Sequence, residues 1–286
     1  MRPNAQRRMY AGEPLSRVVF KGVASLTIAF GIACSGTTAP VQAGGTADQG
    51  PTPSCFGKDA TLLGTPADDK LIGTPGDDVI VGLGGSDEID GGGGNDSICS
   101  GEGADALTTS AGRDSLDGGP GADAIEAGGG DDRLIGGDGR DSLDGAGGDD
   151  QLQGGAMEDS LSGGPGSDEL VGGGGGDKVS FATAPRAVKV DLGNQTAAGH
   201  GADTLRQIEA VDGSSFSDQI SGTSRRDVLT GAGGPDVLIG GAGADTLYGQ
   251  RGRDTGRGGS EKDTCFDIEV RQGCERHFNR PQQPSD

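Results

Sequence analysis

Residues 118–144 have the sequence GGPGADAIEAGGGDDRLIGGDGRDSLD, which is three consecutive units of nine residues. Each unit has an aspartate at its sixth position and a branched aliphatic residue at its eighth. The same register runs through thirteen units, from residue 64 to residue 180, without an insertion or a deletion. A fixed period of this length sets the architecture of the chain before any local propensity is considered.

The aspartates at the sixth position are the main candidate ligands of the chain. They are Asp69, Asp78, Asp87, Asp96, Asp105, Asp114, Asp123, Asp132, Asp141, Asp150, Asp159, Asp168 and Asp177. The fourth position of these units is glycine, except for Ala67 and Met157.

The two halves of each unit favour different backbone conformations. The Gly-rich half permits positive φ angles and therefore predicts a tight turn. A helix is disfavoured there, because each glycine costs about 1 kcal/mol in a helix. The second half alternates inward and outward side chains, as a short strand does. Two units then make one full turn of a coil of parallel strands ~4.8 Å apart, with the aliphatic column as a thin core. The sequence therefore predicts an all-β fold.

This coil places the aspartates of successive turns in rows along both edges. Carboxylates at such a spacing repel one another, so we expect a cation between them. The carboxylates and the turn carbonyls are hard oxygen donors, which suit Ca²⁺ with its six to eight ligands at ~2.3–2.6 Å. The ligand position contains neither His nor Cys, which disfavours zinc and copper, and Mg²⁺ requires a stricter octahedron.

Units of the form G-G-x-G-x-D-x-U-x, where U is aliphatic, resemble the hemolysin-type calcium-binding repeats, or RTX nonapeptides. The resemblance covers residues 64–180. It implies a parallel β-roll, a right-handed two-sided β-solenoid with several calcium ions in the Gly-Asp turns. It also implies that each ion lies between aspartates of successive turns on the same side. Asp78 would then share an ion with Asp96, and Asp87 with Asp105.

The alternative to a roll is an acidic, Gly-rich disordered segment. A net charge of −21 and 60 glycines favour disorder. Disorder, however, gives no reason for an aliphatic residue at every ninth position. Without calcium the carboxylate rows lack counterions, and we expect the chain to be disordered in that state.

A second repeat block follows an interruption. Residues 181–212 lack the nonapeptide period, and apolar and polar residues alternate from Val188 to Leu192, which predicts a strand. The period resumes over residues 213–266. The ligands predicted there are Asp227, Asp236, Asp245 and Asp254.

Three units of this second block lack glycine at the fourth position. They have Phe216, Arg225 and Glu261 there, and we expect them to bind weakly or not at all. Asp218 and Asp263, which belong to two of these units, are not among the predicted ligands, whereas Asp227, of the unit with Arg225, is.

The ends of the chain differ from the repeats. Residues 1–43 combine an Arg-rich start with an apolar run too short to span a membrane, which is typical of a secretory signal peptide. Lipoprotein anchoring at Cys34 is the alternative. Residues 44–54 are expected to be a linker, residues 55–63 an N-terminal cap that keeps the nine-residue phase, and residues 267–286 a polar tail.

The cysteine count is consistent with secretion. Five cysteines are present, and four remain after removal of residues 1–43, an even number. Cys265 and Cys274 are close enough along the chain for a local disulfide, which leaves Cys55 and Cys99 as a second pair. Free thiols at either pair are the alternative.

No catalytic motif is present in the sequence. His200 and His277 are the only histidines, and neither lies in an H-E-x-x-H or G-x-S-x-G context. The chain has no Trp and two Tyr, so it offers little surface for stacking sugars. A pI near 4.3 excludes nucleic acid as a natural partner.

These features together predict an extracellular, secreted calcium-binding β-roll without a transmembrane span. We expect it to fold on binding Ca²⁺ and to have a structural or surface-interaction role rather than a catalytic one. The sequence does not identify its extracellular or cell-surface partner. The alternative is a calcium-dependent secreted enzyme, or an accessory polymer-binding module, with its site near residues 181–212.

Overall fold

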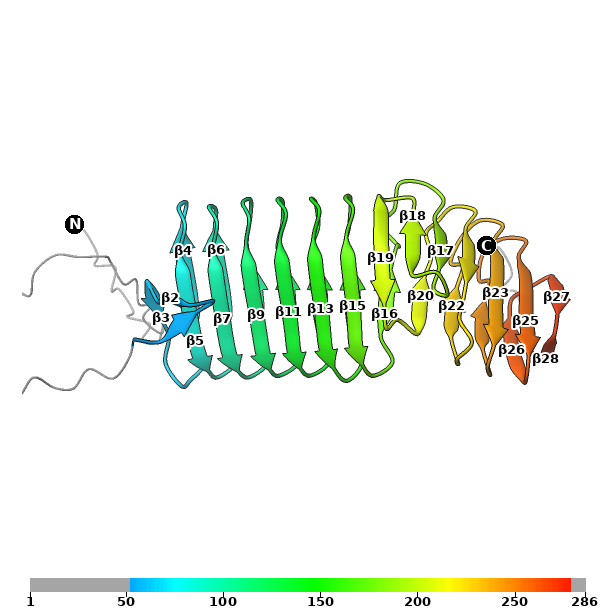
Figure 1. The fold of residues 1–286 in the computed structure, drawn as a ribbon, viewed down its shortest axis with the longest axis horizontal. Coiled ribbons are helices and arrows are strands. Elements are labelled where there is room, and N and C mark those ends of the chain that lie inside the picture. Colours follow the sequence, from blue (N-terminus) through cyan, green and yellow to red (C-terminus); the bar gives the residue numbers. More distant parts are fainter. Residues whose placement is uncertain (1–51, 279–286) are drawn as a thin grey trace, which may run out of the picture. The chain divides into compact units, whose positions relative to one another are not determined.

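The computed structural model describes residues 52–278, and these residues form two parallel sheets joined by turns, with no helix among them (Figure 1). Outside an N-terminal hairpin and residues 181–212, successive strands alternate between the two sheets, as expected for a two-sided solenoid. The predicted all-β, parallel β-roll is therefore confirmed. The predicted signal peptide, with the alternative anchor at Cys34, most of the predicted linker and the last eight residues of the predicted polar tail lie outside the described residues.

The larger sheet has fourteen strands. In spatial order they are β3 (Leu62–Leu63), β5 (Val79–Gly84), β7 (Ser97–Glu102), β9 (Ser115–Pro120), β11 (Arg133–Asp138), β13 (Gln151–Ala156), β15 (Glu169–Gly174), β19 (Ala202–Arg206), β18 (Thr196–Ala198), β17 (Lys189–Asp191), β21 (Gln219–Ser221), β23 (Val237–Ala242), β25 (Thr255–Ser260) and β27 (Val270–Gln272).

The smaller sheet has twelve strands. In spatial order they are β4 (Lys70–Thr74), β6 (Glu88–Gly92), β8 (Ala106–Thr108), β10 (Ala124–Glu126), β12 (Ser142–Asp144), β14 (Ser160–Ser162), β16 (Lys178–Ser180), β20 (Ala210–Asp212), β22 (Val228–Thr230), β24 (Thr246–Tyr248), β26 (Asp263–Phe266) and β28 (Cys274–Phe278).

The strand register confirms that two units make one turn. Ile125 lies opposite Leu107 on one side and Leu143 on the other, which are eighteen residues away in each direction. The aliphatic position of every unit therefore stacks on the same position of the next turn.

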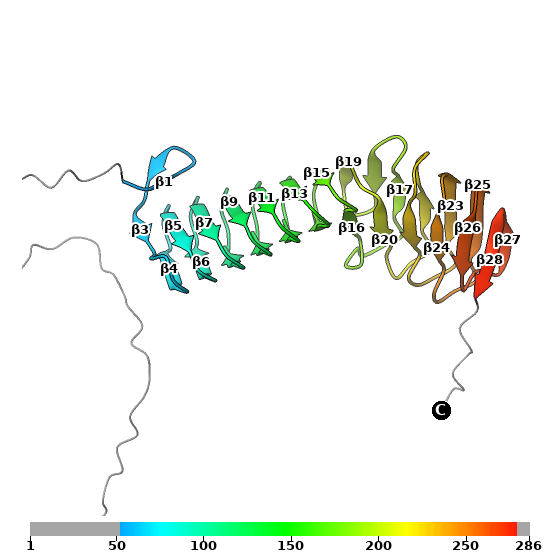
Figure 2. The same ribbon diagram turned by 90° about the horizontal axis from the view of Figure 1, so that it is seen from below.

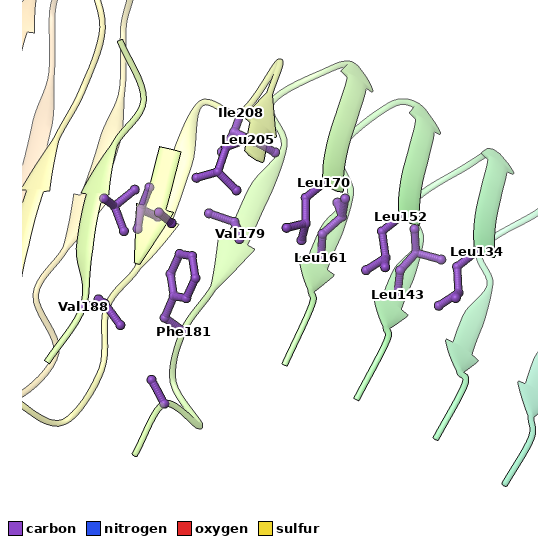
Figure 3. Close-up of a cluster of buried hydrophobic side chains, with 14 of the residues drawn as sticks. Leu134, Leu143, Leu152, Leu161, Leu170, Val179, Phe181, Val188, Leu205 and Ile208 are labelled. Carbon is purple, nitrogen blue, oxygen red and sulfur yellow. The ribbon is translucent and has the colours of Figure 1, made fainter. Parts of the chain in front are cut away.

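The core is a continuous column of these aliphatic side chains. Leu134, Leu143 and Leu152 come alternately from the two sheets and point toward one another (Figure 3). Each is at most 1% exposed. Full burial of a leucine contributes about 1.5–3 kcal/mol. Because a turn contacts only its neighbours, the stability of such a fold is close to a sum over turns and their interfaces.

The interruption at residues 181–212 alters only the larger sheet. β15 pairs in parallel with β19, but β19, β18 and β17 pair antiparallel to one another, and β17 returns to parallel pairing with β21. The smaller sheet continues in parallel through β16, β20 and β22. β17 is the strand that the alternation from Val188 to Leu192 predicted. Buried Phe181, Leu205 and Ile208 keep the core continuous through the interruption (Figure 3).

A short hairpin, β1 (Ser54–Cys55) and β2 (Lys58–Asp59), precedes the first turns (Figure 2). Cys55 packs with Val79 and Val81 in a cluster separate from the main core. These two valines flank the inward-facing Ile80, so the hairpin covers the outer face of the larger sheet. Leu62, in β3, pairs with Ile80 and begins the stack of turns.

Both cysteine pairs anticipated from the sequence are disulfides. Cys55 is bonded to Cys99, with 5.7 Å between their Cα atoms, and this bond attaches the N-terminal hairpin to β7. Cys265 is bonded to Cys274 and links the last two strands of the smaller sheet. Among residues 52–278, no helix is long and apolar enough to cross a membrane.

Candidate metal sites

The repeat aspartates form two rows, one preceding the strands of each sheet. Within each repeat block, the backbone N–H of an aspartate donates a hydrogen bond to Oδ1 of the aspartate one turn later. Asp105 donates to Asp123 over 2.9 Å, and Asp123 donates to Asp141 over the same distance. The pairs predicted to share an ion are both brought together in this way. Asp78 donates to Asp96, and Asp87 donates to Asp105, each over 2.8 Å.

The second carboxylate oxygen of these aspartates has no partner. Oδ2 is buried and accepts no hydrogen bond within the protein in most of the row. The aspartates concerned are Asp87, Asp96, Asp105, Asp114, Asp123, Asp132, Asp141, Asp150, Asp159, Asp168, Asp177, Asp236, Asp245, Asp254 and Asp263. A buried carboxylate oxygen without a partner is costly, so these rows need a positive charge or a proton.

Backbone carbonyl oxygens of the adjacent turn lie beside the carboxylates. A Cβ atom placed on Gly121 would be 1.5 Å from the carbonyl oxygen of Gly103 and 3.1 Å from Oδ1 of Asp123. The same contacts recur at Gly166, with the Gly148 carbonyl at 1.7 Å and Asp168 Oδ1 at 3.2 Å. Glycine fits this position because the two turns approach so closely; at Met157, which occupies the same position in another unit, the backbone has a φ of 76°.

The donors collected in each turn are therefore all hard oxygens, which fit Ca²⁺. In the part of the chain that the structure describes, no three His, Cys, Asp or Glu side chains converge on one point. This agrees with a site in which two carboxylates are completed by main-chain carbonyls. Calcium held there would neutralise the rows and link one turn to the next.

A family model of the RTX calcium-binding nonapeptide repeat (4 copies) matches residues 63–98, 100–134, 126–156, 144–179, 212–234 and 230–265. This chain belongs to the RTX calcium-binding nonapeptide repeat family. The family resemblance found in the sequence is thereby confirmed. A comparison with curated proteins found no match.

Burial raises the pKa of many RTX-repeat aspartates. Desolvation is the largest cause, and the neighbouring carboxylates of the same row add to it. The pKa is raised to about 7 for Asp123, Asp150 and Asp236. It is raised to about 6 for a further group, namely Asp96, Asp132, Asp159, Asp168, Asp203 and Asp245. The metal-free RTX roll therefore binds protons where the unfolded chain would not.

The raised pKa values predict that the metal-free RTX roll is more stable at acid pH than at neutral pH. Between the ordinary aspartate pKa of 3.8 and the raised values near 7, the folded state binds more protons than the unfolded state. Its stability is therefore greatest at the acid end of this window and falls as the pH rises through about 6–7. In metal-free buffer we expect a β-sheet circular dichroism spectrum near pH 4–5 that is lost by pH 8. Spectra that are the same at both pH values would contradict this prediction.

Four RTX-repeat aspartates have a hydroxyl partner at the second position of their unit. Thr65 and Thr74 donate from both N–H and Oγ1 to Oδ2 of Asp69 and Asp78. Ser214 and Thr223 bond in a similar way to Asp218 and Asp227, although Oδ1 of Asp227 stays buried without a partner. These carboxylates have less need of a cation than those in the middle of the roll.

The RTX rows contain three carboxylates that the sequence analysis missed. Asp168 donates its N–H to Asp203 over 3.3 Å, and Asp177 donates to Glu209 over 3.2 Å. At the C-terminal end of the roll, the backbone N–H of Asp254 bonds to Oε2 of Glu269 in the same way.

The sequence carried a signal for two of these three residues. Asp203 lies in a displaced unit, Gly199-x-Gly201-x-Asp203-x-Leu205, and Glu209 precedes Asp218 by nine residues. For Glu269 we find no such signal. Asp263, left out because of Glu261, also lies in a row and accepts the N–H of Asp245 over 2.9 Å.

Proposed function

We propose that this RTX-repeat protein is secreted, that it folds when it binds calcium outside the cell, and that it is a structural or surface-interaction protein rather than an enzyme. The observation that carries the proposal is the pair of rows of buried aspartates whose Oδ2 atoms lack a partner. The proposed ligands are the seventeen aspartates predicted from the sequence, together with turn carbonyls.

The structure gives a physical reason for folding to depend on calcium. The core is a single column of aliphatic side chains, and each turn must bring a carboxylate and a carbonyl oxygen close together. Without a cation, the repulsion between carboxylates opposes that close approach. With a cation bound between them, the same carboxylates link one turn to the next. Ligands that bind only the folded state stabilise it by mass action, and extracellular calcium sites typically have affinities of ~10⁻⁴–10⁻³ M.

A non-catalytic role is supported by the chemistry of the described residues. The repeat carboxylates accept hydrogen bonds from the backbone N–H groups of the preceding turn, and so connect successive turns. His200, which is partly buried, has its pKa lowered by desolvation and by the nearby Arg186, and no G-x-S-x-G or zinc-binding motif surrounds it. The outer faces of the two sheets bear charged side chains together with exposed apolar ones such as Ile72, Val237 and Val270, a mixture that suits a surface contact more than a reaction.

The second candidate is an enzyme or a polymer-binding module, and one observation favours it. Two pockets, of about 480 and 440 Å³, lie at the interruption between the repeat blocks. Leu192, Leu205 and Ile208 line the first, beside Arg225. Arg186 and Lys189 line the second. Neither lining contains a carboxylate or a nucleophile paired with a base, so binding of a ligand fits these pockets better than catalysis.

A calcium titration followed by far-UV circular dichroism tests the proposal. We expect the full-length chain to change from a coil to a β-sheet spectrum near millimolar Ca²⁺ at pH 7.5, and to show no such change with Mg²⁺ at the same concentration. A spectrum that is already β-sheet in chelator at this pH, and indifferent to calcium, would overturn calcium-dependent folding and favour the second candidate.

A further inference from the structure

We propose that Asp203 completes a calcium site with Asp168 at the interruption, and that this site holds the inserted strands β17–β19 against the first repeat block. The inference deepens the proposed function and rests on calcium binding by the repeats. Neither the nonapeptide register nor the family match includes Asp203, since the match ends at residue 179 and resumes at residue 212.

The backbone around Asp203 stacks on the first block as a repeat unit does. Leu205 lies opposite Leu170, so the aliphatic column continues through it. The N–H of Thr204 donates to the carbonyl of Asp168 over 2.8 Å, as the N–H of Glu169 donates to Asp150 one turn earlier.

The turn before Asp203 repeats the close approach seen in the regular units. A Cβ atom on Gly201 would be 1.2 Å from the carbonyl oxygen of Gly166, and one on Gly166 would be 1.7 Å from that of Gly148. Residues 198–206 therefore form a fourteenth unit next to the first block. This unit does not keep the nine-residue spacing of the sequence, but the fold places its strand in register with those of the first block.

The donors facing this turn match those of the regular sites. Asp168 is 3% exposed, and its Oδ2 is buried without a partner. Asp203 is 4% exposed and accepts the N–H of Asp168 on Oδ1. Two basic side chains of the region have other partners, because Arg186 donates to the Gly199 carbonyl and Arg206 pairs with Glu169.

The opposite row is different at the same level of the stack. Glu209 occupies the aspartate position there, and its Oε1 pairs with Arg225 at 3.0 Å. A protein cation thus neutralises Glu209, whereas Asp168 and Asp203 have none. The row ends after Asp203. In the next turn, the residue that donates its N–H to Asp218 is Val188 rather than an aspartate. Asp203 therefore has only one neighbouring aspartate in its row, Asp168, and removing its charge should remove one ion.

The test compares four variants of the full-length chain with the wild type. Bound calcium is counted by equilibrium dialysis against millimolar CaCl₂, followed by metal analysis. Trypsin cleavage after Arg186 and Lys189, both in the insertion, reports whether the inserted strands are held in place. The variants are D203N, D203E, the control D191N in the same insertion, and the repeat control D123N.

We expect D203N to bind one calcium fewer than the wild type and to be cleaved in the insertion about tenfold faster. D203E keeps a carboxylate and should retain the ion. D191N should match the wild type, since Asp191 is held by Asn194 away from the rows. D123N should lose calcium without faster cleavage in the insertion.

The outcomes separate this inference from the proposed function. If D203N keeps the wild-type calcium count and trypsin resistance while D123N loses calcium, Asp203 is not a ligand and the proposed function stands. If the wild type itself binds no calcium, the proposed function fails first. A D203N chain that loses most of its ions, with no recovery in D203E, would show that Asp203 is needed for folding rather than for one site, and would also overturn the inference.

Discussion

Replacing Gly139 by valine is expected to break the roll near its middle, whereas the same replacement at Gly147 is expected to be tolerated. A Cβ atom at Gly139 would be 1.4 Å from the Gly121 carbonyl oxygen, and nothing lies within 4 Å of one at Gly147. Two side chains at this fourth position, Met157 and Glu261, are accommodated at positive φ angles of 76° and 81°, and Met157 is 63% exposed. Such a φ is especially unfavourable for a β-branched residue.

We expect Gly139→Val to lower the free energy of unfolding by about 2–3 kcal/mol in saturating calcium, which is the upper range for a residue forced into a sparsely populated backbone conformation. Urea unfolding followed by circular dichroism measures the change. Gly147→Val, eight residues away in the next unit, controls for the bulk and β-propensity of valine. Equal effects of the two substitutions would contradict the close-approach argument.

The substitution Asp123→Asn is expected to have opposite effects with and without calcium. The pKa of Asp123 is raised to about 7 by burial and by the carboxylates of Asp141 and Asp105, so its charge destabilises the metal-free roll at pH 7.5. Asparagine removes that charge and keeps an oxygen to accept the N–H of Asp105. It also removes an anionic ligand, which lowers calcium affinity.

In metal-free buffer at pH 7.5 we therefore expect the Asp123→Asn chain to retain more β-sheet signal than the wild type. In a calcium titration its folding midpoint should rise several-fold, with at least one ion fewer bound at saturation. Asp138→Asn, which removes an exposed carboxylate from the end of β11, is the matched control for net charge. Destabilisation of the Asp123 variant in both conditions would show that its carboxylate is needed for hydrogen bonding rather than for binding a cation.

Much of the fold could be predicted from the sequence because each turn contacts only its neighbours. The eighteen-residue spacing of Leu107, Ile125 and Leu143 is enough to predict the length of a turn, the register of strand pairing and the column of core residues. The same regularity predicted that Asp78 and Asp96 would be neighbours. A site built from one repeated unit needs no information about distant parts of the chain.

The outer-face hairpin could not be predicted in this way. Cys55 contacts Val79 and Val81 by crossing the outer face of the larger sheet, where the nine-residue period sets no constraint. The pairing of Cys55 with Cys99 was anticipated only by elimination. Its location on an outer face, rather than over the open end of the core, came from the packing of Cys55 against these two outward-facing valines, which the hairpin buries.

The sequence by itself determined the solenoid, its two rows of aspartates and their suitability for calcium, since all of these follow from a strict local period. The tertiary structure alone decided how the rows end. Asp203 lies 35 residues after Asp168, and only the antiparallel excursion through β17 and β18 brings the two together. A row of carboxylates is extended by any acidic residue whose backbone stacks in register, and stacking depends on hydrogen bonds between strands rather than on phase along the chain.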